Sequence, residues 1–327
     1  ADIKELAKVF TGLGVGGVME NEWVDEPYFG LDIYVADMTT PMIMYEEWHQ
    51  PGTKTLVNGY VIPAGQTGLK DINDAVHQLF LHPNVGPFIG KQLIQRLVTS
   101  NPTPGYISRV AAVFADNGQG ERGDMGAVIK AILMDPEART CSALEEDRFG
   151  KLREPFTRYT HFSKAIQMEQ YYGRYWNVAY GFYQATNQMP LASRTVFNFF
   201  LPDFQPIGAI ADNGLVGPEF QIHNSRTSIE FINRVNDWAV WGYVMDDWEA
   251  ENPSVTYNID ELTPLARDPE VLINRLDVLF THGMLSDRTR QIIKDAITPM
   301  ISEDYRNDRT RLAMYLIMIS PDYAIMK

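Results

Sequence analysis

Helix-start signals followed by apolar residues at helical spacing recur along this chain. Thr103 and Pro104 supply an N-cap and a first-turn proline ahead of an apolar face that includes Val110 and Phe114. Further predicted helix starts are Asp71, Asp124, Thr227 with Glu230 as a capping box, Asp268 and Ser286. Strand-like alternation is scarce. We therefore expect an all-α protein, a multi-helix globular bundle with two long irregular loops.

The length and composition indicate a globular protein with a sizeable core. The chain has 327 residues, of which 45% are hydrophobic and 21% charged. We expect one large helical domain over residues 1–327, with a looser subdivision into 1–140 and 141–327. The apolar run from Leu312 to Ile319 is far too short to cross a bilayer, so we expect no transmembrane segment.

The charge balance and the cysteine content exclude several classes of function. The chain carries 42 acidic and 28 basic residues, a net charge of −14, and an acidic surface repels phosphate backbones. Nucleic acid is therefore not an expected partner. Cys141 is the only cysteine, which rules out an intrachain disulfide and a cysteine-based zinc cluster.

Two long stretches lack clean periodicity. Residues 12–70 are rich in glycine, proline and aromatic residues, and residues 201–224 are apolar but interrupted by glycine and proline. Structureless connections longer than about 15 residues are usually functional loops or disordered segments. Their apolar content predicts that they pack against the helices, which makes them the first places to look for a site.

His49 and Lys54 form the candidate catalytic pair. A histidine can act as a general base or a metal ligand, and a lysine can bind an anionic group or pair with a carboxylate. The structural alternative is that His49 caps a turn and Lys54 makes an ion pair. Gln50 follows His49 directly, so the adjacent residue supplies no carboxylate to orient the ring.

The second irregular stretch carries candidate metal ligands. Asp203, Asp212, Glu219 and His223 offer oxygen and nitrogen atoms on loop backbone, as a metal site requires. Their spacing matches no EF-hand. Acidic residues beside glycine also serve in turns, which is the simpler interpretation.

An aromatic cluster follows residue 170. Tyr172, Tyr175 and Trp176 could line a groove for a sugar or for apolar side chains of a partner, and with Arg153 they form the candidate ligand-binding set. Core packing between helices is the alternative for aromatic residues at this spacing.

Several motifs in order carry a resemblance to a known family. They are VFTGLG at 9–14, HPNVGPFIGKQL at 82–93, KLREPF at 151–156, SRTVFNFFLPDF at 193–204 and LIMISPDYA at 316–324. Together they resemble the domain-of-unknown-function 1800 family of exported bacterial proteins, over about the C-terminal two-thirds of a member. His49, Gly52 and Lys54 match the family's His-Asp-x-Gly-x-Lys segment, with Gln50 where an acid is usual.

The resemblance implies a compartment and a kind of partner, but it names no reaction and no cofactor. It implies a secreted or periplasmic protein, often encoded near a second exported family that could be its partner. Members usually carry a further helical region upstream, so we expect this chain to be a fragment that lacks it. Two functions remain open. One is a binding or assembly protein that uses the aromatic cluster and residues 201–224. The alternative is a hydrolase or metal-dependent enzyme centred on His49, Lys54 and the acids of residues 203–219.

Overall fold

The chain divides into two compact units. The computed structural model describes residues 2–20, 24–141, 146, 148–170, 180–193, 195–242, 255–300 and 302–327. Unit 1 is Ala1–Ile89 and unit 2 is Gly90–Lys327, so the boundary falls inside helix α3 (Val85–Leu97). The subdivision near residue 140 stays a prediction.

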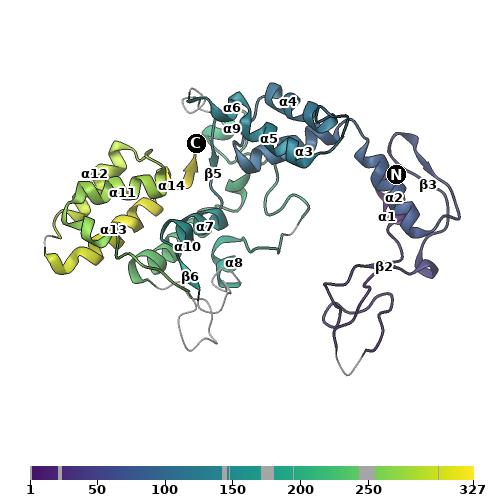
Figure 1. Cartoon of the computed structure of the whole chain (residues 1–327), viewed down its shortest axis with the longest axis horizontal. Helices are drawn as coiled ribbons and strands as arrows, with labels where there is room; N and C mark the ends of the chain where they lie inside the picture. The colour runs from purple at the N-terminus through teal and green to yellow at the C-terminus, as the bar shows by residue number, and fades with distance from the viewer. Residues whose placement is uncertain are drawn as a thin grey trace. The chain divides into compact units, whose positions relative to one another are not determined.

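Unit 1 combines two helices with short two-stranded ladders (Figure 1). Its elements before α3 are α1 (Asp2–Val9), β1 (Leu13–Gly14), β2 (Ile43–Met44), η1 (Glu46–Trp48), β3 (Lys54–Thr55), η2 (Val57–Gly59), β4 (Val61–Ile62) and α2 (Gly68–Phe80). The pairs β1–β2 and β3–β4 are antiparallel. A small apolar cluster of Val9, Leu56, Ile62 and Ala75 joins α1 and α2 to the β3–β4 ladder.

Unit 2 is mostly helical, and its strands are two residues long. Before residue 210 its elements are the rest of α3, α4 (Pro104–Ala115), α5 (Met125–Met134), α6 (Pro136–Arg139), β5 (Lys151–Leu152), α7 (Pro155–Ala165), β6 (Glu169–Gln170), α8 (Tyr180–Thr186) and α9 (Ala209–Asp212). Then follow η5 (Pro218–Gln221), α10 (Ser225–Val235), the π-helical η6 (Asn236–Trp241), β7 (Val255–Thr256), η7 (Thr263–Arg267), α11 (Pro269–Thr281), α12 (Asp287–Ile297), η8 (Glu303–Tyr305), α13 (Arg306–Met318), α14 (Pro321–Ala324) and β8 (Ile325–Met326). β5 pairs with β8 and β6 with β7, both antiparallel. The all-α prediction is confirmed.

Most of the predicted helix starts are confirmed by cap geometry. The side chains of Thr103, Asp124, Asp268 and Ser286 each accept a hydrogen bond from a backbone N–H in the first turn of the following helix. Two predictions were wrong. The N-cap of α2 is Thr67, and Asp71 lies inside the helix; the N-cap of α10 is Asn224, with Thr227 as its reciprocal partner.

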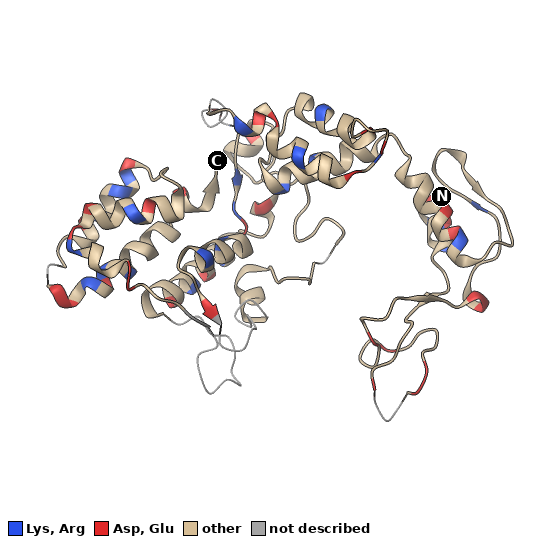
Figure 2. Cartoon of the chain, viewed as in Figure 1, with Lys and Arg blue, Asp and Glu red and all other residues tan. Residues whose placement is uncertain are grey.

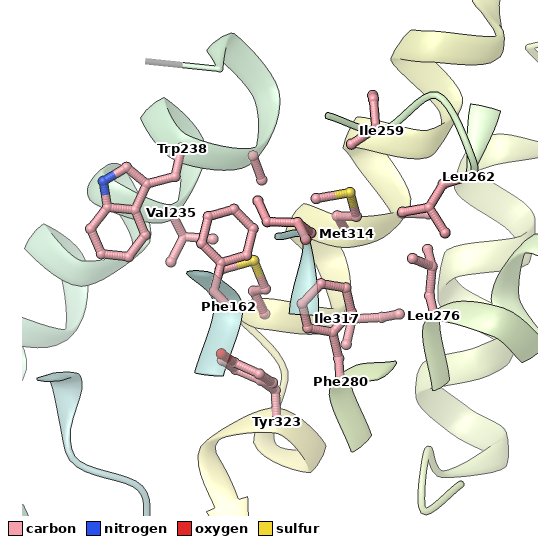
Figure 3. Packing of buried hydrophobic residues seen from close by; sticks show 14 of the residues in the cluster. Phe162, Val235, Trp238, Ile259, Leu262, Leu276, Phe280, Met314, Ile317 and Tyr323 are labelled. Atoms are coloured by element: carbon pink, nitrogen blue, oxygen red, sulfur yellow. The ribbon is translucent and has the colours of Figure 1, made fainter. Parts of the chain in front are cut away.

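The core of unit 2 lies between α7, α10–η6, α11 and α13. Figure 3 shows Phe162, Trp238, Phe280 and Ile317 pointing into one apolar cluster from these elements. The Phe162 ring stacks on Trp238 and on Phe280, with centroids 6.1 and 6.3 Å apart. This packing also fixes α11, whose C-terminal end contributes to the cavity described below.

The irregular stretches are less buried than their apolar content predicted. In unit 1 Leu31 and Ala36 are buried, but Ile33, Tyr34 and Met38 are exposed. In residues 201–224 Glu219 and Ile222 are buried, whereas Ile207 is exposed. Acidic and basic residues both occur on α11, α12 and α13 (Figure 2). Among the described residues, no helix is both long and apolar enough to cross a membrane.

Candidate functional site

His49, Lys54 and Asp71 meet in a buried polar network inside unit 1. His49 follows η1, Lys54 opens β3, and Asp71 lies in the first turns of α2. His49 Nε2 is 3.1 Å from Asp71 Oδ2, and the Lys54 ammonium donates to the same carboxylate oxygen. His49 is 7% exposed, and Lys54 and Asp71 are each 1% exposed. The predicted pair therefore has a third member from a separate helix.

The hydrogen bonds of this network assign the histidine tautomer. His49 Nδ1 lies 2.8 Å from the carbonyl oxygen of Thr11, which can only accept, so Nδ1 carries a proton. Lys54 Nζ lies 3.2 Å from His49 Nε2 and 2.5 Å from the carbonyl oxygen of Gln50. With a neutral imidazole, the three ammonium protons of Lys54 meet three acceptors: Gln50, Asp71 and His49. The network is satisfied internally, as buried polar groups require.

The electrostatics of Asp71 follow from the same contacts. Burial raises the pKa of its carboxyl, but hydrogen bonds from Lys54 and Gln66 outweigh burial and hold the pKa below its usual value. Gln66 Nε2 donates to Asp71 Oδ1 at 2.9 Å. A lowered folded-state pKa stabilises the fold above the unfolded pKa of about 4, and this stabilisation is lost as pH falls through the lower value.

The network favours the structural interpretation of His49 and Lys54. A general base needs an unoccupied lone pair within reach of substrate. Here one ring nitrogen of His49 donates to Thr11, and the lone pair of the other accepts from Lys54. Asp71 supplies the acid of this network, and it is linked to the ring through the Lys54 ammonium. One signal in the sequence points to a buried Asp71. It lies one helical turn before the apolar residue Ala75, and therefore on the same inner face of α2.

The four predicted metal ligands in unit 2 are not brought together. Glu219 is buried and pairs with Lys151 at 3.0 Å, whereas Asp203 and Asp212 are exposed. His223 Nε2 lies 3.3 Å from Ser228 Oγ. In the described ranges, no three His, Cys, Asp or Glu side chains lie close enough to hold a metal ion. Glu219 is not available to the other three residues because it lies in η5, where its side chain is buried and paired with Lys151.

The candidate ligand-binding set is only partly described. Tyr172, Tyr175 and Trp176 lie outside the described residues. Arg153 follows β5 and is 5% exposed. Its guanidinium carbon lies 4.9 Å from the centre of the Tyr323 ring, and Nη1 is 3.4 Å from His161 Nδ1. No carboxylate among the described residues lies within ion-pair distance of Arg153.

Arg153 forms part of the wall of a cavity of about 360 Å³ in unit 2. Cavities of this size are typical of small-ligand sites. The wall comes from the residue after β5, the C-terminal end of α11, α14 and β8, and it includes Thr281, His282, Met284, Pro321, Asp322 and Ile325. This cavity was not predicted from the sequence, because its wall joins segments more than a hundred residues apart.

Two histidines of unit 2 are held neutral. Burial, together with electrostatic contributions from Arg153 and His282, lowers the pKa of His161 to about 4. The His161 and His282 ring centroids are 5.3 Å apart. Burial, with a further contribution from Arg158, lowers the pKa of His223 to about 4. His161 therefore adds no second positive charge beside Arg153 at neutral pH.

Comparison with known proteins places the chain in a family. A family model described as "Protein of unknown function (DUF1800)" matches residues 1–325. The chain belongs to this family. We expected the chain to correspond to about the C-terminal two-thirds of a family member. That detail was wrong, because the family model matches essentially the whole chain. Searches of curated proteins and of solved structures found no match.

For this DUF1800 protein we predict that Asp71→Asn destabilises unit 1 by about 3–5 kcal/mol, because it leaves the Lys54 ammonium buried without a carboxylate. Chemical denaturation, with limited proteolysis of residues 2–89 as a local probe, measures the loss. Asp74→Asn is the matched control on α2. Its pair with Lys70 is solvent-exposed, so the expected cost is below about 1 kcal/mol. Equal effects of the two substitutions would contradict the structural role.

A double substitution separates the buried charge from simple packing. Lys54→Met with Asp71→Leu removes both charges and keeps apolar volume, so it should recover most of the stability that Asp71→Asn loses. Recovery is measured as the shift in denaturant midpoint relative to wild type.

The stability of unit 2 should fall as pH drops from about 6.5 to about 4. The unfolded chain takes up protons at His161 and His223 near pH 6.5, whereas the folded chain resists them down to about 4. Denaturant midpoints across this range check the slope. His161→Phe should make the slope shallower. His77→Gln, an exposed change on α2, should leave it unaltered, and an unaltered slope in His161→Phe would refute the assignment.

Proposed function

We propose that this DUF1800 protein is a binding protein, and that unit 2 takes a small ligand with an apolar body and one anionic group. The observation that carries the proposal is Arg153, a buried guanidinium at the wall of the 360 Å³ cavity without a carboxylate partner among the described residues.

The electrostatics of Arg153 support an anion as the ligand. A guanidinium removed from water is costly unless it is paired, and the Tyr323 ring and the neutral His161 compensate its charge only in part. Asp322, the carboxylate in the cavity wall, already accepts hydrogen bonds from the backbone N–H and the hydroxyl of Ser286. A carboxylate or phosphate group of a ligand is the missing counter-charge, and Arg can bind either with two parallel hydrogen bonds.

The rest of the wall supports an apolar ligand body. Met284, Pro321, Ile325 and Met326 present carbon and sulfur atoms to the cavity. Small-ligand sites are mostly apolar with a few polar groups that fix orientation. In a chain with a net charge of −14, a general attraction for anions is absent, so binding depends on the basic residues of the wall, Arg153 and Lys327.

The backbone at His282 also supports a site at this position. His282 is the C-cap of α11 with φ 57° and ψ 32°, the left-handed conformation in which glycine is the usual residue. Non-glycine residues in this region carry strain that is often found at functional sites. The His282 side chain lies in the wall of the cavity, with its ring centroid 5.3 Å from that of His161.

The family resemblance supports the finer parts of the proposal. It favours a secreted or periplasmic bacterial protein with a second exported protein, encoded nearby, as partner. An enzyme centred on His49, Lys54 and the acids of residues 203–219 is the alternative. The internal satisfaction of the His49 network and the pairing of Glu219 with Lys151 give that alternative less support.

Ligand binding is tested by calorimetric titration with straight-chain and aromatic monocarboxylates and with phosphate monoesters. Arg153→Met should weaken binding of the best anion about tenfold or more, because one charge-assisted contact contributes about 1.5–3 kcal/mol. Arg267→Met, an exposed arginine of unit 2 paired with Glu303, is the control and should bind as wild type does. Equal affinity in Arg153→Met, or no binding of any anion by wild type, would overturn the proposal.

Localisation is tested by fractionating a bacterium that produces this protein. We expect immunoblots to find the protein in the periplasm or the medium. Recovery in the cytoplasm alone would contradict export.

A further inference from the structure

The geometry points to a fixed binding site for one neutral, water-sized molecule in unit 2, bounded by α3 and η5 and separate from the Arg153 cavity. Three buried polar atoms without a hydrogen-bond partner identify it: Gln95 Oε1, Arg96 Nη1 and Glu219 Oε2. All three residues line the same small cavity, together with Phe200, Pro202 and Pro218.

The orientation of each group is fixed by its other contacts. Gln95 Nε2 donates to the carbonyl oxygens of Ser100 and Pro202, at 3.0 and 2.9 Å, so a flipped amide would set Oε1 against two acceptors. The unpartnered Oε1 therefore cannot exchange places with Nε2.

The two charged groups are held in the same way. Arg96 Nη2 donates to the Phe197 carbonyl oxygen at 3.0 Å, and its guanidinium stacks 4.1 Å from the centre of the Phe200 ring. Glu219 Oε1 accepts from the Lys151 ammonium at 3.0 Å. Arg96 Nη1 and Glu219 Oε2 are thus left for a further partner.

Lys151 anchors this arrangement. Its ammonium donates to the carbonyl oxygens of Gln95 and Arg96, at 2.8 and 2.9 Å, in the last turn of α3. A cation at a helix C-terminus satisfies unpaired carbonyls and complements the helix dipole. Gln95, Arg96 and Glu219 are therefore arranged around one buried ammonium.

The chemistry of the three atoms selects the occupant. Gln95 Oε1 and Glu219 Oε2 accept, and Arg96 Nη1 donates, so the occupant must donate twice and accept once. An anion would face two acceptor oxygens, and a cation would face Arg96 and Lys151. The volume that the centre of a water-sized sphere can occupy inside this cavity is about 10 Å³, which is enough for one water molecule. Water meets each of these conditions.

The site joins segments that are far apart in the sequence. The occupant would link the C-terminal turn of α3 to η5, and through Lys151 to β5. Polar contacts through this molecule would then connect α3 to the irregular stretch of residues 201–224. The sequence had predicted apolar packing between that stretch and the helices.

A high-resolution crystal structure of the complete chain tests the proposal. We expect one density peak within hydrogen-bond distance of all three atoms in wild type. Gln95→Met, which removes the Oε1 acceptor, should lose the peak, whereas Gln92→Met in the same wall should keep it. If Gln95→Met does not fold, the wild-type density alone decides. An empty cavity, an ion in place of water, or direct pairing of the three side chains would overturn the site.

Discussion

Buried positive charge is the constraint on which both units of this DUF1800 protein are built. In unit 1 the Lys54 ammonium is taken out of water and matched by Asp71, His49 and a backbone carbonyl. In unit 2 Lys151 is matched by Glu219 and by two carbonyls at the end of α3. Charges of this kind are costly to bury unless every donor finds an acceptor. The backbone around each lysine is therefore fixed.

This constraint explains how long irregular segments are held against helices. The chain around His49 and Lys54 has little regular structure, and the small apolar cluster of unit 1 is extended by the charged network on α2. In unit 2 the residues near Glu219 are fixed to the end of α3 through Lys151. Apolar packing orders the helices, and directional hydrogen bonds order the segments between them, because loops have few apolar residues at regular spacing.

Arg153 differs from the two lysines because it has no carboxylate partner among the described residues and lies at the wall of a cavity. It lies two residues after Lys151 in the KLREPF motif, is equally buried, and has an aromatic ring and a neutral histidine as neighbours where the lysines have carboxylates. The family match establishes lineage and leaves activity open. Arg153 is a buried cation at a cavity wall with no carboxylate partner among the described residues, and our binding proposal depends on this feature.

The sequence by itself determined the helical class and most helix starts, since a cap such as Thr103 or Asp268 acts on backbone N–H groups within its own first turn. It also indicated His49 and Lys54 as candidate functional residues, and the structure places Lys54 Nζ 3.2 Å from His49 Nε2. The role of Asp71 was decided by tertiary structure: as a cap it would face solvent, but inside α2 it meets Lys54 from a different segment. The same holds for Glu219 and Lys151. Local signals reach a few residues along the chain, whereas a buried ion pair depends on which distant segments fold together.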